Sequence, residues 1–214
     1  EDGPAAPGVL SPGDTVVTGF SGLLPPPSDL PAGADPLDYS FIDPDGASME
    51  VQRPLPAGPP AGQLIDAPTL FSAPARDVGQ VFAVTLDDAA APDIFLGATS
   101  AFGIHIVAPG DDGMLHHVRQ GMPGAQFMRG QWGADKGGSP GSIYRVDGVT
   151  GDISLFSTIG ANSGPGLGDV VFDAASRQFF ASDLDTGLIY RLDSTGLIED
   201  TFDHGVDGRP AHGL

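Results

Sequence analysis

The sequence has 214 residues and contains no cysteine. This absence excludes disulfide bonds, thiolate nucleophiles and zinc sites built from cysteine. Glutamate is also scarce, since Glu1, Glu50 and Glu199 are the only three in the chain. A chain of this length can bury a core that needs no covalent cross-links, so size does not limit the fold.

Basic residues are few. Lys and Arg total 9 against 28 Asp and Glu, which gives a formal net charge of −19 at pH 7. A surface with this charge repels polyanions, so we expect no nucleic-acid partner. The acidity fits cation binding, a basic protein partner, or solubility alone.

Long apolar runs are missing as well. No stretch reaches the ~18 residues that a membrane-spanning helix needs, so we expect no transmembrane segment. The chain begins at Glu1 rather than at Met. We interpret this start as the result of signal-peptide removal, with a proteolytic fragment as the competing explanation. The expected location is therefore extracytoplasmic, meaning periplasmic, secreted or at the cell surface.

Turn-forming residues are abundant, with 32 Gly and 21 Pro. No segment shows a sustained helical period with caps, while short bursts of Val, Ile, Leu and Phe recur between turns, so the composition predicts an all-β fold. Prolines remove backbone donors from a sheet ladder. We therefore expect residues 1–77 to form an irregular Pro/Gly-rich wrap with short strands at 15–20, 39–42 and 48–51.

A repeat organises the rest of the chain. The motif Ile-Tyr-Arg-Val-Asp at residues 143–147 returns as Ile-Tyr-Arg-Leu-Asp at 189–193, which is an offset of 46 residues. Each copy lies within a set of short apolar runs separated by turns. The two sets predict four strands each, and the eight strands are expected at 81–87, 93–97, 143–147, 151–156, 168–173, 177–182, 189–193 and 196–202.

Residues 183–191, with the sequence DLDTGLIYR, and the preceding VVFD at 170–173 resemble a blade of the NHL-repeat and gluconolactonase-like β-propellers, which are six-bladed. The resemblance implies a partial propeller of four-stranded antiparallel blades. The first blade spans residues 78–160 with a long insertion at 98–141 between its second and third strands. The second blade and a C-terminal connection span 161–214. Because closed propellers typically have about four to eight blades, we expect a companion polypeptide or further blades to complete the ring.

Acidic and amide side chains cluster in the connections of the second blade. In a meander, the loop between the second and third strands lies at the same end as the connection between blades. This end would hold Asn162, Asp169, Asp183 and Asp185, with His204 after the last strand. Calcium prefers such oxygen ligands, so a calcium site is one hypothesis. The alternative is that Asp183 and Asp185 only cap a tight turn.

The insertion at 98–141 gathers His105, His116, Met122 and the single Trp132. Imidazole and thioether ligands together suit copper, but neighbouring side chains on a strand point to opposite faces, so His116 and His117 are poorly placed to share one ion. We therefore favour calcium over copper as the cofactor. Trp132 is a candidate platform for stacking a planar ligand, with packing inside the fold as the alternative.

Three functions remain open at this point. The first is a non-enzymatic exported propeller segment for binding or assembly, with a possible structural Ca²⁺. The second, implied by the gluconolactonase-like resemblance, is a metal-dependent lactonase or hydrolase whose site is completed by blades outside this chain. The third is a surface or matrix component. No catalytic residue is assigned, because no Gly-x-Ser-x-Gly, His-Glu-x-x-His or phosphate-binding loop motif occurs.

Overall fold

The structure is a computed structural model that describes residues 8–28, 30, 32–54, 67–203 and 205. In these ranges the protein is all-β, as the composition predicts, and its strands form four antiparallel sheets. Helical structure in the described ranges is confined to three single turns, which are η1 (Pro36–Tyr39), α1 (Ala75–Val78) and η2 (Ala134–Lys136). None of the helices in the described ranges is long and apolar enough to cross a membrane.

The middle sheet is a four-stranded meander formed by β4 (Val81–Leu86), β5 (Ile94–Ala98), β9 (Ser142–Val146) and β10 (Ile153–Thr158). These strands match the four that the sequence predicts for the first repeat. A long segment interrupts the meander between β5 and β9, where the sequence also places an insertion. The first three strands consist mainly of Val, Ile, Leu, Ala and aromatic residues, which suit a sheet that is covered on both faces.

The C-terminal sheet has the same meander order. It contains β11 (Leu167–Asp173), β12 (Gln178–Asp183), β13 (Ile189–Leu192) and β14 (Ile198–Phe202). The strands predicted for the second repeat are confirmed. The two copies of the repeated Ile-Tyr-Arg motif form β9 and β13, the third strand of each sheet, so the repeat in sequence is a repeat in structure.

The N-terminal region is more regular than expected, because three of its segments form one antiparallel sheet. The sheet has the order β1 (Thr15–Thr18), β2 (Ala47–Gln52) and β3 (Thr69–Pro74). The strands predicted near 15–20 and 48–51 are present. Strand β3 was not predicted, since prolines flank it. It lies at the sheet edge, where Pro74 interrupts no central ladder.

The strand predicted at 39–42 is wrong. Tyr39 ends the single turn η1, and Ile42 makes only an isolated bridge with Leu23. Pro36 begins η1, and the fixed φ angle of proline suits the first position of a helical turn. The apolar side chains of this segment are used differently, because Ile42 is 1% exposed and packs into a small core of its own.

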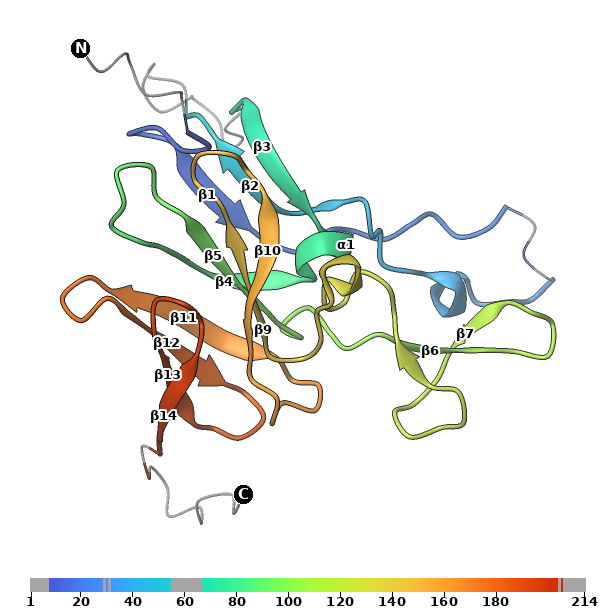
Figure 1. The fold of residues 1–214 in the computed structure, drawn as a ribbon. Helices are drawn as coiled ribbons and strands as arrows, with labels where there is room; N and C mark the ends of the chain where they lie inside the picture. The colour runs from blue at the N-terminus through green and yellow to red at the C-terminus, as the bar shows by residue number, and fades with distance from the viewer. Residues whose placement is uncertain (1–7, 29, 31, 55–66, 204, 206–214) are drawn as a thin grey trace.

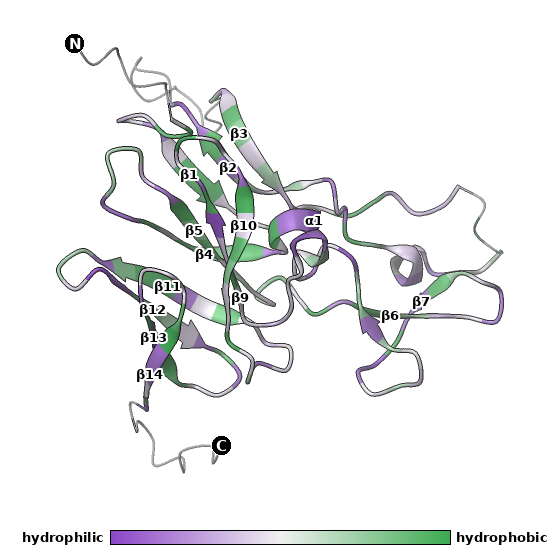
Figure 2. Ribbon diagram, in the orientation of Figure 1, coloured by the Kyte–Doolittle hydropathy of each residue, from purple (hydrophilic) through white to green (hydrophobic). Residues whose placement is uncertain are grey.

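The N-terminal, middle and C-terminal sheets stack face to face in chain order (Figure 1). Strand β4 contacts both β1 and β11, so the first strands of the sheets lie beside one another. One apolar core fills the space between the N-terminal and middle sheets and includes Met49, Val51, Leu96 and Tyr144. A second core between the middle and C-terminal sheets includes Phe95, Ile143, Val170, Phe179 and Leu192. Figure 2 shows hydrophobic residues concentrated along these stacked strands.

The residue pattern of strand β5 reflects its place between two sheets. All five of its residues are buried, since alternate side chains enter the two different cores. Gly97 allows the C-terminal sheet to approach closely, because a Cβ at this position would lie 3.0 Å from Cγ2 of Val170. A strand covered on both faces loses the apolar and polar alternation that marks a half-exposed strand.

The insertion after β5 forms a separate lobe that projects from the stack (Figure 1). Its small sheet has the order β7 (Leu115–His117), β6 (Ile106–Pro109) and β8 (Gln126–Phe127). A core of Val107, Met128 and Ile42 joins the lobe to the N-terminal region. The backbone N–H of Ile42 donates a hydrogen bond to Sδ of Met128 at 3.0 Å.

We expect Leu96→Ala to lower the free energy of unfolding by about 2–5 kcal/mol, because it opens a cavity in the first core. Leu96 is 0% exposed, whereas Leu197, at 64%, provides a matched control that should change stability by less than about 0.5 kcal/mol as Leu197→Ala. Urea denaturation measures both values. Equal effects of the two substitutions would contradict the stacked arrangement.

Candidate functional site

The buried amide of Asn162 organises the connection between the middle and C-terminal sheets. Its Oδ1 accepts hydrogen bonds from the backbone N–H groups of Gly164 at 3.1 Å and Gly166 at 3.0 Å. Its Nδ2 donates to the carbonyl oxygen of Gly166 at 2.8 Å and to Oδ1 of Asp183. Asn162 is 7% exposed, so this side chain replaces water for a loop whose backbone groups would otherwise be unpaired.

Asp183 ends β12 and is 2% exposed. Besides the amide of Asn162, its Oδ1 accepts the N–H of Asp185 at 3.2 Å. Its Oδ2 accepts the hydroxyl of Thr186 at 2.6 Å and the N–H of Thr186 at 3.3 Å. The carboxylate therefore caps the tight turn that leads into β13, as the turn alternative proposed from the sequence describes.

The other predicted oxygen ligands divide into two groups. Asp185 joins the network, because its Oδ2 accepts the N–H of Ser163 at 2.6 Å. Asp169 does not join it. Among the residues that the structure describes, its exposed side chain accepts only the adjacent N–H of Val170 at 2.8 Å, and its own N–H donates to Ser182. His204 lies outside the described residues.

The structure thus brings together Asn162, Asp183 and Asp185, and it uses their oxygens to hold two connections in place. A cation bound here would compete with the N–H and O–H donors that already occupy these oxygens. Across the described part of the chain, no three His, Asp or Glu side chains are grouped so that they could hold a metal ion.

Trp132 belongs to the first core. It is 4% exposed and packs edge-on against Phe127, with ring centroids 5.6 Å apart and an interplanar angle of 89°. Its carbonyl oxygen accepts a hydrogen bond from the buried hydroxyl of Tyr144. A Cβ at Gly138 would overlap that hydroxyl, so glycine is required where the insertion returns to β9. Because the side chain is almost completely buried in this core, Trp132 acts here as a packing residue.

The histidines of the insertion pair differently from the sequence hypothesis. The ring of His105 lies edge-on to that of His117, with centroids 6.2 Å apart, and stacks on Phe20. Nε2 of His117 lies 2.8 Å from the carbonyl oxygen of Ser40. Since a carbonyl only accepts, Nε2 carries the proton. Burial, and then the neighbouring His117, lower the pKa of His105 below its usual value of about 6.5.

His116 points away from this pair. Its Nε2 lies 3.0 Å from both carboxylate oxygens of Asp112, and its ring packs edge-on against Tyr39. The alternation of side chains along β7 therefore separates His116 from His117, as the strand geometry predicts. The contact with His116 also lowers the pKa of the Asp112 carboxyl group.

A cleft that the sequence did not indicate lies at the opposite ends of the strands, away from the network around Asn162. Its volume is about 380 Å³, and it lies between the middle and C-terminal sheets. The hairpin loops of these sheets, between the first two and the last two strands, surround it. The lining residues are Asp87, Asp93, Phe95, Arg145, Phe156, Phe172, Arg177, Phe179, Ser194 and Thr195.

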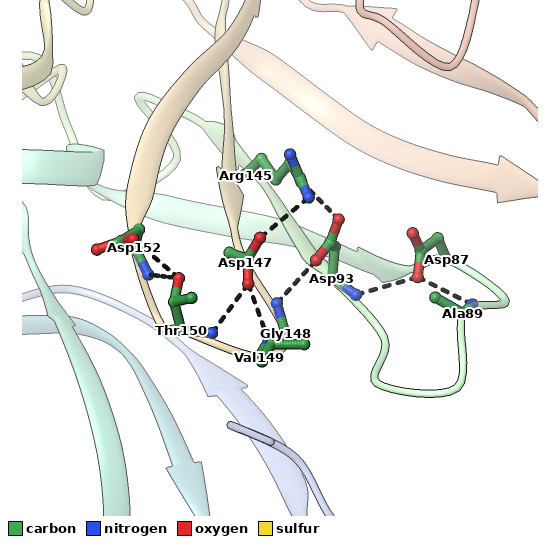
Figure 3. A network of polar contacts seen from close by, with 9 residues as sticks. All are labelled: Asp87, Ala89, Asp93, Arg145, Asp147, Gly148, Val149, Thr150 and Asp152. Carbon is green, nitrogen blue, oxygen red and sulfur yellow. Dashed lines mark hydrogen bonds and ion pairs between the residues drawn. The ribbon is translucent and has the colours of Figure 1, made fainter. Parts of the chain in front are cut away.

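Arg145 is held at this cleft by two carboxylates (Figure 3). Its Nε donates to Asp93 at 2.5 Å and its Nη2 donates to Asp147 at 3.2 Å. Asp93 also accepts the N–H of Gly148 at 2.7 Å. The hydrogen bond to Asp93 raises the pKa of Arg145, and the backbone N–H groups of Thr150 and then Val149 lower that of Asp147. Arg145 is the third residue of the repeated Ile-Tyr-Arg motif.

Arg177 contributes the second positive charge. It has a φ of 56°, which is the left-handed region that non-glycine residues rarely adopt. Its Nη1 donates to Asp88 at 2.7 Å, and its guanidinium carbon lies 6.0 Å from the ring centroid of Phe172. The cation–π geometry and the ion pair together direct this side chain along the cleft wall.

Four phenylalanines form the apolar part of the cleft. Phe95 and Phe179 are buried at its inner end, with centroids 4.3 Å apart, and Phe156 and Phe172 are half-buried walls that both contact Phe179. A scarce arginine inside a repeated motif is the sequence signal that points to this place. Arg145 and Arg177 line the same cleft only because the two sheets stack, and no feature of the sequence indicates this.

The chain matches no known protein-family description, and neither a curated protein nor a solved structure is significantly similar to it. Fold and site together define a class, which is an all-β protein of stacked antiparallel sheets with the strand order of propeller blades. Its two candidate places for function are the buried network around Asn162 and the charged, aromatic cleft between the last two sheets.

We expect Asn162→Ala to destabilise the protein by about 2–4 kcal/mol, because two backbone donors and the Asp183 carboxylate lose a buried partner. Asp169→Asn, a change at an exposed carboxylate in the next strand, should alter stability by less than about 0.5 kcal/mol. Thermal and urea denaturation measure both. A melting temperature of the unmodified protein that falls when calcium is chelated would instead assign these oxygens to an ion.

The lowered pKa of His105 predicts that stability declines as the pH falls below about 6.5, since the unfolded chain takes up the proton first. The loss should level off below the folded-state pKa. His105→Gln should flatten the dependence between pH 7.5 and 5.5, whereas His116→Gln should keep it. NMR titration of the imidazole protons locates the midpoint for His105, and a value at or above 6.5 would contradict the burial effect.

Proposed function

We propose that this protein is an exported binding or assembly module that forms part of a β-propeller. In this proposal its C-terminal sheet receives a further antiparallel β-sheet, supplied by a companion polypeptide or by further blades. The supporting observation is a difference in burial between two equivalent strands. Strand β5 is buried along its whole length, while β12 alternates between half-buried and buried residues.

The exposed side of β12 belongs to what we call the outer face of the C-terminal sheet. Two cross-strand rows make this face, and their members are Val171, Phe180, Arg191 and Asp200 in one row and Asp169, Ser182, Ile189 and Phe202 in the other. Val171 is 49% exposed and Phe202 is 62% exposed. Apolar side chains on a continuous exposed sheet face are typical of a surface that another element covers.

The arginine of this face is already paired, while Asp169 stays exposed, so the net charge of the face is negative. Arg191 forms ion pairs with Glu199 at 2.9 Å and with Asp200 at 3.7 Å. A second sheet can therefore cover the apolar side chains while the paired charges stay at the periphery, as in a typical protein interface.

The N-terminal sheet, which lies on the far side of the stack from the C-terminal sheet, has different chemistry. The outer side of the N-terminal sheet carries Thr15, Gln52, Glu50 and Ser72, and Gln52 donates to Glu50 at 2.8 Å. This side also carries Val17 and Leu70, which are 43% and 45% exposed, on its two edge strands, but its central strand β2 presents only the polar Glu50 and Gln52. Because strand β12, inside the C-terminal sheet, instead presents Phe180, we infer that the assembly grows from the C-terminal sheet.

The likeness of residues 183–191 to the NHL-repeat and gluconolactonase-like propellers agrees with this proposal, since adjoining blades in that architecture cover each other's faces. The extracytoplasmic location is likewise part of the proposal.

Native mass spectrometry of the protein purified from its own source tests the assembly. We expect a complex heavier than the 21.8 kDa chain, with a companion polypeptide or a longer form of the same protein. Phe180→Glu and Phe202→Glu should release the chain from the complex while the melting temperature of the isolated chain is retained. Leu70→Glu, at a 45% exposed position of the N-terminal sheet, is the matched control and should leave the complex intact. A native mass of 21.8 kDa would overturn the proposal.

A further inference from the structure

We propose that the cleft between the middle and C-terminal sheets binds a free amino acid with an aromatic side chain, held by its carboxylate, its ammonium group and its ring. This site is independent of the proposed assembly, because none of the cleft residues belongs to the outer face of the C-terminal sheet. Three features of the cleft lead to this ligand, and they are its unused guanidinium donors, its excess of carboxylates and its aromatic walls.

The donors come from the two arginines. Arg145 uses Nε and Nη2 for Asp93 and Asp147, and Arg177 uses Nη1 for Asp88. Within the described residues, Nη1 of Arg145 and Nε and Nη2 of Arg177 have no protein acceptor. Both side chains line the same cleft, and guanidinium groups are well suited to carboxylates. The ion pairs orient these donors, and because the side chains of Arg145 and Arg177 are 42% and 61% exposed, the free donors are accessible to a ligand carboxylate.

The carboxylates argue against a ligand that carries only negative charge. Four of them, on Asp87, Asp88, Asp93 and Asp147, surround the two arginines, so the local charge is negative. Oδ1 of Asp87 accepts the N–H groups of Ala89 at 3.2 Å and Asp93 at 3.0 Å. In the described part of the chain, Oδ2 of Asp87 has no donor. An ammonium group at this oxygen restores the charge balance that a bound carboxylate would disturb.

The walls and the volume select the rest of the ligand. Phe156 and Phe172 expose part of their rings to the cleft, while the buried Phe95 and Phe179 close its inner end. Aromatic rings pair favourably edge-to-face or offset with such walls. A cleft of about 380 Å³ is at the lower end of the range for ligand sites, which fits one amino acid better than a peptide.

The conformation of Arg177 adds an independent indication. An arginine occupies a left-handed turn position, at φ 56°, where glycine would fit without strain. Strained residues of this kind concentrate where a side chain is needed in one particular place. Here the side chain reaches the cleft wall at Phe172, which glycine would leave empty.

Isothermal titration calorimetry with four probes tests the proposal on the full chain. The probes are L-phenylalanine, 3-phenylpropionate, 2-phenylethylamine and glycine, which separate the contributions of carboxylate, ammonium group and ring. We expect saturable binding of L-phenylalanine at concentrations up to about 10 mM, and at least about tenfold weaker binding of the other three. Arg177→Gln should weaken binding of L-phenylalanine at least about tenfold.

The control variant is Arg129→Gln, because Arg129 is an exposed arginine that is paired with Asp135 outside the cleft, and it should bind as the unmodified protein does. Melting temperatures establish that both variants are folded. Absence of saturable binding by L-phenylalanine overturns the proposal. If 3-phenylpropionate binds as tightly as L-phenylalanine, the cleft is only a carboxylate site. If 2-phenylethylamine binds as tightly, the cleft is only a cation site. Either result also overturns the proposal. None of these outcomes changes the native mass, so the assembly proposal is tested separately.

Discussion

Burial of the middle sheet on both faces is the constraint on which the rest of this structure depends. Its strand β5 has no solvent-facing side, since Leu96 enters one core and Phe95 the other. The N-terminal sheet and the C-terminal sheet both pack against the middle sheet, where β4 contacts β1 and β11. Gly97 of β5 determines how closely the C-terminal sheet approaches. In a chain without disulfides, this shared packing is what joins three separate meanders into one folded unit.

Polar groups find their hydrogen-bond partners differently at the two ends of the strands. At the end where the sheets connect, Asn162 and Asp183 satisfy the backbone of the loops and leave a closed network. At the hairpin end, Arg145 is fixed by two carboxylates and Arg177 by one, and each keeps guanidinium N–H groups that have no acceptor among the described residues. The first arrangement stabilises the fold, whereas the second keeps polar groups in position around an open cleft.

Much of the fold could be predicted because strands, turns and the repeat are local in sequence. The Ile-Tyr-Arg motif marks the third strand of both four-stranded sheets, and Asp183 caps the turn that the segment from Asp183 to Gly187 indicates. The errors fall where local signals are misleading. Prolines around β3 suggested an irregular wrap, yet an edge strand tolerates them. Apolar residues near Ile42 suggested a strand, yet they fill the core of the projecting lobe.

The sequence by itself determined the all-β class, the eight strands of the repeated part, the position of the insertion and the turn chemistry around Asp183. Each of these follows from residues within a few positions of one another. Only the tertiary structure decided which residues meet across sheets. It placed Trp132 in a core, joined His105 to His117, and set Arg145 and Arg177 on opposite walls of one cleft. The reason is physical, because the pairing of faces depends on the stacking and spacing of whole sheets, and no short stretch of sequence encodes that distance.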